Sequence, residues 1–157
     1  MKQRILTTPA IFLLVLFISI FLTAQVYAES CEKVVHAFNV RLSSGIDEQE
    51  LTEIFRSLNK TNNKKLPPKF VSKREARSRG WHPGKDLWSV SALKGSSMGG
   101  DHFKNMEGQL PYNKWREADL DYHGGHRGGK RLIFSADGAR FVTVDHYRTF
   151  TEVPPCR

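Results

Sequence analysis

The period of the apolar residues changes near Gly95, and this change constrains the fold more than any other feature. Before Gly95, apolar residues recur roughly every three to four positions, the spacing of an amphipathic helix. After Gly95, apolar and polar residues alternate between turn residues, as in short strands. Helices followed by a run of strands predict an α+β protein, with N-terminal helices packed on a C-terminal antiparallel sheet.

Two helices are expected at the start of this region. The first covers 31–42 and stops before Gly45. The second begins after Asp47, which together with Glu50 has the spacing of a capping box, and ends at the polar run 59–65. Its apolar residues form one stripe at helical spacing: Leu51, Ile54, Phe55 and Leu58.

A third, short helix is expected after the two prolines that follow this polar run. Ser72 and Glu75 repeat the capping-box spacing, and Gly80 is placed to close the helix. Residues 86–90 are expected to add one further helical turn.

Strands are expected in the C-terminal half. Residues 115–122 alternate, which places one set of side chains on one face, namely Ala118, Leu120 and Tyr122, and the other set on the opposite face, namely Glu117, Asp119 and Asp121. Residues 131–134 and 140–144 flank an Asp-Gly pair that is typical of a hairpin turn. Residues 145–151 are expected to form the last strand.

The N-terminus has the pattern of a cleavable secretory signal. Lys2 and Arg4 precede an apolar run over 10–22, and a small-x-small ending follows at 26–28. We expect cleavage after Ala28. The alternative is an uncleaved anchor, which is disfavoured because the run is shorter than the ~20 residues that span a bilayer.

The chain has two cysteines, Cys31 and Cys156. Export to an oxidising compartment permits one intramolecular disulfide between them. Free or intermolecular thiols are the alternative, and two cysteines are too few for a structural zinc site without histidines. His123 and His126 lack further ligand residues clustered around them, so we expect no metal site.

The formal charge is +8, from 24 Lys and Arg against 16 Asp and Glu. A basic exported protein favours an anionic partner, such as nucleic acid, a membrane surface or an acidic polysaccharide, although a solvated basic face is the common alternative. Phosphoryl transfer from a ribose 2′-OH requires a base, an acid and cations. Candidates for these roles lie in the strand region, although each has a structural explanation when taken singly: Glu117, Arg127, Arg131 and His146.

Five segments taken together resemble a known family. They are LPPKFVSKREARSRGW, GGDHFKNMEGQLP, WREADLDY, HRGGKRLIFSADG and TVDHYRTFT, and they span 66–150. Their order and spacing resemble those of the guanyl-preferring secreted ribonucleases of bacteria, the family of barnase and binase. The resemblance implies the microbial ribonuclease fold, with a catalytic region at 66–157 preceded by helical residues at 29–65 in one domain, 29–157.

The resemblance also implies roles for residues in the matching segments. Glu117 matches the general base and His146 the general acid. The family's cationic residues beside the scissile phosphate correspond to Lys73, Arg127 and Arg131. The family's guanine-binding segment corresponds to five residues of this chain, and Glu107 among them matches the carboxylate that reads the base. The five are Phe103, Lys104, Asn105, Met106 and Glu107. Asp101 matches a residue that holds this loop, and Tyr147 matches a tyrosine lining the site.

These roles imply an endoribonuclease that cleaves single-stranded RNA after guanosine, through a 2′,3′-cyclic phosphate that is then hydrolysed, with no metal or cofactor. Met106 stands where better-known members carry an arginine, so the guanine loop has one cation fewer, which bears on base preference and on affinity for an acidic inhibitor. His126 replaces an aromatic residue just before Arg127. The alternative is a non-catalytic protein that binds RNA or anionic surfaces. The resemblance further implies a secreted monomer, extracellular or periplasmic and free of the membrane after cleavage, with an acidic barstar-like inhibitor as a possible partner.

Overall fold

The computed structural model describes residues 29–157, so the expected signal segment 1–28 lies outside the described residues. Helices and short 3-10 turns, interrupted by one short strand, come first in the chain, and five strands follow them. The elements are α2 (Cys31–Asn39), α3 (Glu48–Lys60), β1 (Phe70–Val71), α4 (Lys73–Ser78), η1 (Leu87–Ser89), η2 (Ser91–Leu93), β2 (Ser97–His102), β3 (Arg116–Asp119), β4 (Arg131–Phe134), β5 (Arg140–Thr143) and β6 (Thr151–Glu152). No helix among these residues is long and apolar enough to cross a membrane.

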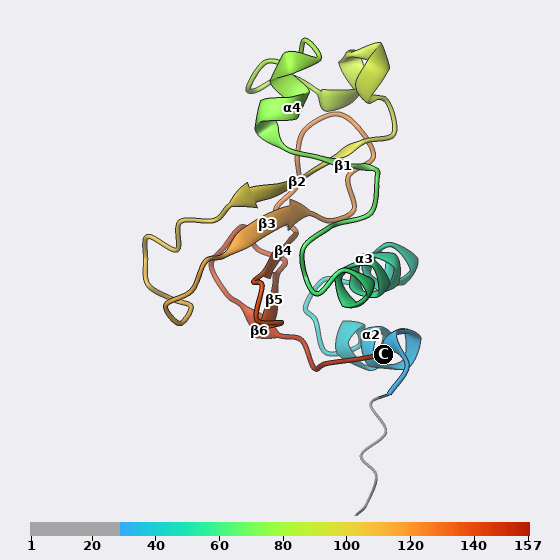
Figure 1. The fold of residues 1–157 in the computed structure, drawn as a ribbon, viewed down its shortest axis with the longest axis vertical. Coiled ribbons are helices and arrows are strands. Elements are labelled where there is room, and N and C mark those ends of the chain that lie inside the picture. Colours follow the sequence, from blue (N-terminus) through green and yellow to red (C-terminus); the bar gives the residue numbers. More distant parts are fainter. Residues whose placement is uncertain (1–28) are drawn as a thin grey trace, which may run out of the picture.

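The strands form one six-stranded sheet in chain order, β1 to β6 (Figure 1). Strands β2 to β6 pair antiparallel, whereas β1 pairs parallel with β2. The α+β class is therefore confirmed, and β1 is an element that the sequence pattern did not predict. Its parallel pairing is possible because α4 and the η turns form a crossover between β1 and β2.

The main core lies between one face of the sheet and helices α2 and α3 (Figure 1). The two helices present fully buried apolar side chains, and the sheet contributes Ala118, Leu132, Phe134 and Val142. Residues of opposite parity on the same strands point to the other face, where Glu117, Asp119 and Arg131 are found. The alternation of β3 and β4 thus gives the sheet one apolar face and one charged face.

The disulfide between Cys31 and Cys156 is present, as the sequence predicted, and it joins α2 to the C-terminal segment. Backbone bonds reinforce this junction, because Cys31 N donates to Arg157 O at 3.0 Å and Arg157 N donates to Glu29 O at 2.9 Å. The side chain of Asn59 on α3 donates to Cys156 O at 2.9 Å. Both ends of the described chain are therefore fastened to the helical layer.

Each predicted capping box forms the bond from the helix backbone to the first residue of the box, but the Glu50 side chain does not form the reciprocal bond. Asp47 accepts from Glu50 N at 3.0 Å, and Ser72 accepts from Glu75 N at 3.1 Å, as expected. The reciprocal bonds are replaced: the Glu50 carboxylate binds Lys69 Nζ and Asp121 N instead, each at 2.6 Å. A buried carboxylate is stabilised more by an ammonium group than by a helix-end amide.

Two predicted elements are longer than the observed ones. The first helix ends at Asn39 rather than at residue 42, because Asn39 turns its side chain to hold Ile46. The strand predicted over 115–122 covers only Arg116–Asp119. It ends because Asp121 has a left-handed backbone, φ 55°. Tyr122 consequently leaves the main core and packs in a second cluster beneath α4.

The last predicted strand, 145–151, is wrong. The structure has a turn after β5, and only Thr151–Glu152 pairs as β6. His146 and Tyr147 have left-handed backbones, φ 59° and 69°, so these two residues cannot be part of a strand. His146 therefore lies on a turn at the charged face.

Candidate active site

An irregularity in the pairing of β2 with β3 positions the first residues of the site. The register of β2 against β3 shifts between Gly99 and Asp101, which sets Asp101 opposite Glu117. Asp101 accepts from the backbone N of Lys73 at 2.8 Å, and this bond fastens the first residue of α4 above β3. Gly99 has no room for a side chain, because an added Cβ would lie 2.7 Å from the Phe70 ring.

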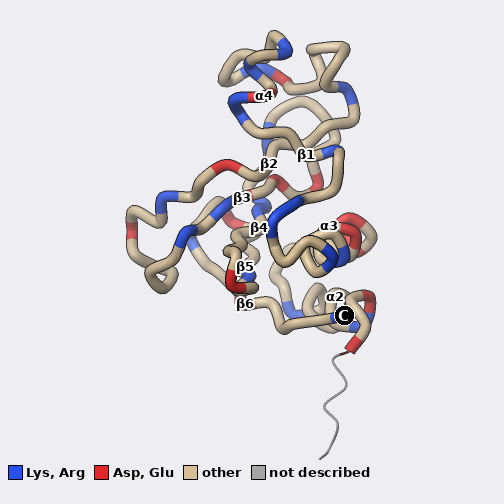
Figure 2. The backbone as a smooth tube through the Cα atoms, in the orientation of Figure 1, with Lys and Arg blue, Asp and Glu red and all other residues tan. Residues whose placement is uncertain are grey.

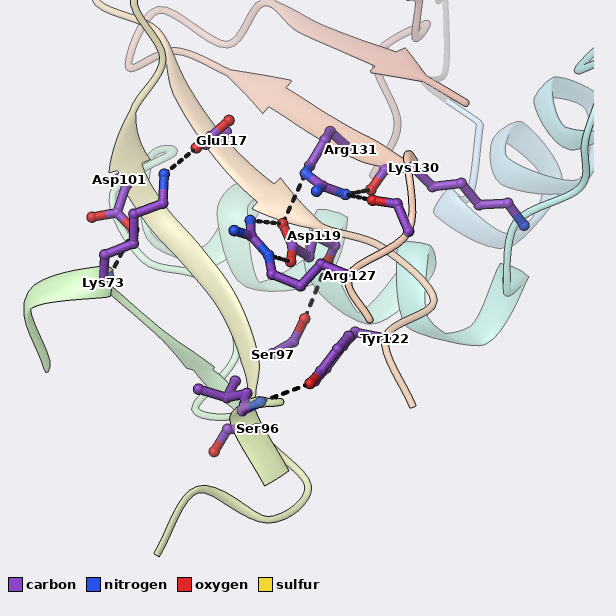
Figure 3. A network of polar contacts seen from close by, with 12 residues as sticks. Lys73, Ser96, Ser97, Asp101, Glu117, Asp119, Tyr122, Arg127, Lys130 and Arg131 are labelled. Carbon is purple, nitrogen blue, oxygen red and sulfur yellow. Dashed lines mark hydrogen bonds and ion pairs between the residues drawn. The ribbon is translucent and has the colours of Figure 1, made fainter. Parts of the chain in front are cut away.

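Helix α4 delivers the Lys73 side chain to Glu117. Lys73 Nζ donates to Glu117 Oε1 at 2.8 Å, and Tyr147 OH donates to Glu117 Oε2 at 2.7 Å, so both carboxylate oxygens are engaged (Figure 3 shows the lysine contact). Burial raises the pKa of Glu117, but the hydrogen bonds from Lys73 and Tyr147 and the charges of Lys73 and Arg131 outweigh it and lower that pKa. Glu117 is held as a carboxylate.

Asp119 is the centre of a second ionic group on the same face. It accepts from Arg127 through two nitrogens, one of them NH2 at 2.6 Å, and its Oδ1 lies 2.9 Å from Arg131 Nε (Figure 3). The latter contact is an ion pair without hydrogen-bond geometry. The hydrogen bond to Asp119 raises the pKa of Arg127. Asp119 and Arg131 face each other across β3 and β4 and are almost completely buried.

Asp119 was not among the candidate residues from the sequence, although the alternation had put it on the face of Glu117. The residue bridges two cations that sequence reasoning had considered only as phosphate ligands. The signal was present in the two-residue spacing of Glu117 and Asp119, because such a pair shares one face of a strand. What the pattern did not contain was the pairing with Arg127, which depends on the loop after β3.

The turn after β5 completes the site. Tyr147 stacks on Phe103 with ring centroids 5.3 Å apart, and the Arg131 guanidinium lies 5.9 Å from the Tyr147 ring centroid. Burial and the bond to Glu117 raise the pKa of Tyr147. The His146 ring centroid lies 5.0 Å from that of Tyr147, and His146 N donates to Gly129 O at 3.1 Å. Tyr147 thus links the Glu117 carboxylate to the His146 turn.

A cleft of about 670 Å³ opens beside these residues, and its lining includes Lys73, Arg127, Arg131 and His146. Its lining residues include no carboxylate, so the surface that a ligand meets is cationic, and the neighbouring side chains of Glu117 and Asp119 are buried. Acidic residues gather in the first turn of α3, whose residues do not line the cleft (Figure 2). Such a cleft attracts phosphate groups.

The predicted base-binding residues form a separate loop, 103–110. Its shape is set by Asn105, whose side chain donates to Leu110 O at 2.7 Å and accepts from Leu110 N at 3.1 Å. Asn105 also has a left-handed backbone, φ 47°. Lys104, Met106 and Glu107 are exposed, and Met106 is 81% exposed. The loop does not line the cleft, and its Phe103 ring stacks on Tyr147, which donates to Glu117.

A metal-binding arrangement is not seen in this part of the chain. Among residues 29–157, no group of three or more His, Cys, Asp or Glu side chains is placed to hold a metal ion. His123 and His126 lie on the loop after β3, with His126 at the cleft. The charged and titratable side chains that line the cleft are lysine, arginine and histidine.

The comparisons with known proteins agree with this geometry. A family profile described as ribonuclease matches residues 56–154. Ribonucleases from Bacillus intermedius and Bacillus pumilus are each 42% identical over 93 residues, 57% of this chain and 57% of theirs, so the chain spans just over half their length. A ribonuclease from Heyndrickxia coagulans is 41% identical over 93 residues, 57% of this chain and 84% of its own. The chain belongs to the ribonuclease family, and within it to the bacterial type of barnase and binase.

Proposed function

We propose that the protein is a secreted endoribonuclease that cleaves single-stranded RNA, preferentially after guanosine. The observation that carries the proposal is the buried, ionised Glu117 beside a cationic cleft that also holds His146. An anion-binding cleft alone fits any polyanion binder. A carboxylate kept ionised at its edge is the feature that a base-catalysed phosphoryl transfer requires.

Glu117 is the proposed base. It removes the proton from the ribose 2′-OH while that oxygen attacks the adjacent phosphorus. Because the nucleophile belongs to the substrate, the reaction requires a 2′-OH and the enzyme supplies no nucleophile of its own. The bonds from Lys73 and Tyr147 keep Glu117 deprotonated and fix its position.

His146 is the proposed acid, and the cleft cations stabilise the developing charge. Protonated His146 donates to the departing 5′-oxygen, and the P–O5′ bond breaks to leave a 2′,3′-cyclic phosphate. Hydrolysis of this product uses the same pair with roles exchanged. Lys73, Arg127 and Arg131 offset the charge on the phosphorane oxygens, so that a metal ion is not needed for that purpose.

The loop 103–110 is the proposed guanine site. The Glu107 carboxylate can accept from N1–H and N2–H of guanine. Among the described residues, the backbone N–H groups of Asn105 and Met106 have no acceptor, which leaves them free to donate to O6. Because these donors and acceptors meet an exposed base edge, single-stranded RNA is the proposed substrate.

The remaining proposals concern the environment of the enzyme. The disulfide is compatible with an oxidising location, extracellular or periplasmic, reached by cleavage of the segment 1–28. The cationic cleft would suit an acidic inhibitor protein in the producing cell, with Met106 as the point of difference from better-known members. We propose a monomer in which residues 29–65 and 66–157 fold together.

The proposed function is tested by incubating residues 29–157 with GpU and ApU dinucleotides in EDTA. We expect cleavage of GpU to a 2′,3′-cyclic phosphate, slower cleavage of ApU, and a fall of about 10³-fold in kcat for Glu117→Ala and for His146→Ala. Wild-type rates in both variants would refute the mechanism. RNA binding without cleavage would instead support the non-catalytic alternative.

A further inference from the structure

Asp145 closes the turn that carries His146. Its Oδ1 accepts from the backbone N of Arg148 and of Thr149, each at 3.0 Å, and from Thr143 Oγ1 at 2.8 Å. Its Oδ2 accepts from Thr149 Oγ1 at 2.7 Å. One carboxylate therefore ties the end of β5 to the residues beyond His146.

The turn needs such a tie because its backbone is strained. His146 and Tyr147 are consecutive non-glycine residues in the left-handed region, at φ 59° and 69°. Each such residue costs on the order of 1–3 kcal/mol and persists only where neighbouring contacts enforce it. The hydrogen bonds of Asp145 join a residue before this pair, Thr143, to residues after it, Arg148 and Thr149.

The two residues differ in how far they are held by contacts of their own. Tyr147 has four: its N donates to Thr143 Oγ1 at 3.0 Å, its OH donates to Glu117, its ring stacks on Phe103, and the Arg131 guanidinium lies over that ring. The backbone of His146 has one bond, to Gly129 O, and its side chain is exposed, with its ring centroid 5.0 Å from that of Tyr147. The orientation of the His146 imidazole therefore depends on the conformation of the turn. The orientation of the Tyr147 phenol depends on it less.

We propose that Asp145 is the positioning residue of the general-acid step, holding the His146 imidazole toward the departing 5′-oxygen. The proposal rests on the proposed function and adds to it the residue on which the acid depends. Asp145 acts through the backbone, since its bonds go to the turn and the two threonines. Those same bonds, led by that from the Thr149 hydroxyl, lower the pKa of Asp145 to about 2, so the carboxylate remains an ionised acceptor at pH values above that.

The first test is Asp145→Ala assayed with GpU. Because a misplacement of about 1 Å costs about 10²-fold, we expect kcat to fall about 100-fold. KM should change less than about threefold, because Lys73, Arg127 and Arg131 are untouched. Asp137→Ala is the matched control. Asp137 closes the β4–β5 turn through Ser135 and Ala139, so its loss should affect stability and not kcat.

The second test uses a substrate whose leaving group needs no proton, guanosine 3′-(4-nitrophenyl phosphate). We expect Asp145→Ala to cleave it within about threefold of the wild-type rate. With GpU, the double variant Asp145→Ala/His146→Ala should be as slow as His146→Ala alone, because the two residues serve one step.

A merely structural role gives a different pattern. Equal losses on both substrates, or multiplying losses in the double variant, would overturn the proposal, as would a wild-type kcat in Asp145→Ala. If wild-type protein fails to cleave GpU, it is the proposed function that fails. Should Asp145→Ala not fold, Asp145→Asn keeps the Oδ1 acceptor and is expected to give the same substrate pattern with a smaller loss.

Discussion

The phosphate-side cluster and the base loop are built by opposite means. The cluster, which comprises Lys73, Glu117, Asp119, Arg127 and Arg131, lies mainly on paired strands, and its two carboxylates are buried. The base loop, 103–110, is largely exposed and is held by the side chain of one asparagine. The first region is fixed by many mutually dependent contacts and the second by few.

This difference separates chemistry from recognition. Opposite charges that are buried together stabilise one another strongly but make each member costly to remove. Residues of an exposed loop can change with little effect on stability. We therefore expect substitutions in the cluster to damage fold and catalysis together, and substitutions in the loop to alter base choice alone.

The largest effect is expected for Asp119→Ala. It would leave Arg131 buried without its carboxylate, and breaking such a buried pair costs about 3–5 kcal/mol. Urea unfolding followed by fluorescence measures the loss. An unfolding midpoint equal to that of the wild type would contradict the view that the cluster supports the fold.

Glu107→Ala tests the other side of the comparison. We expect kcat/KM for GpU to fall about 100-fold toward the value for ApU, because two hydrogen bonds to a charged acceptor are lost. The free energy of unfolding should change by less than about 0.5 kcal/mol. Met106→Ala is the control, since that neighbouring side chain is also exposed and contributes no carboxylate. Retention of the guanine preference would exclude Glu107 as its source.

Gly129→Ala tests how closely the segment that contains Gly129 must pack against the His146 turn. An added Cβ would lie 3.1 Å from His146 N and 3.3 Å from its Cβ, so the His146 turn must shift by a few tenths of an ångström. We expect kcat to fall roughly tenfold. At neighbouring Gly128 an added Cβ meets nothing within 4 Å, so Gly128→Ala should stay within about twofold. Equal rates in both variants would show that the turn tolerates the contact.

The smallest effect is expected for Tyr147→Phe, which removes one hydrogen bond from Glu117 and keeps the ring. The pKa of Glu117 is below its usual 4.5, so its ionisation stabilises the fold above that pH, and this contribution is lost as the pH falls through the folded-state pKa. Without the phenol that pKa rises. The acid limb of kcat/KM should move to higher pH in Tyr147→Phe and stay unchanged in Tyr112→Phe, whose ring is exposed. An acid limb that does not move would show that Tyr147 does not control the pKa of Glu117.

The elements that the sequence predicted well are those set by neighbouring residues. The caps at Asp47 and Ser72 each satisfy a backbone N–H three residues away, and β4 has the predicted bounds. The predictions that were wrong involve side-chain contacts that the spacing of apolar residues does not encode. Glu50 pairs with Lys69 rather than with its own helix, and the expected strand 145–151 is a turn tied by Asp145.

The candidate site shows the same division. Sequence patterns and family resemblance together named Glu117, His146, Lys73 and the two arginines, because each lies in a recognisable segment. They did not indicate that Asp119 holds both arginines, since Arg127 comes from a loop whose path no local rule specifies. They also did not indicate that Asn105 shapes its loop through Leu110.

The sequence by itself determined the α+β class, the helix starts, and the face of β3 that carries both carboxylates. Periodicity and capping act within a few residues, so a reader of the chain can apply them directly. Only the tertiary structure decided which cation meets which carboxylate, and that the His146 turn lies against Gly129 and Glu117. Those choices depend on electrostatic and hydrogen-bond energies between groups far apart in the chain, and these act only once the sheet and α4 have brought the groups together.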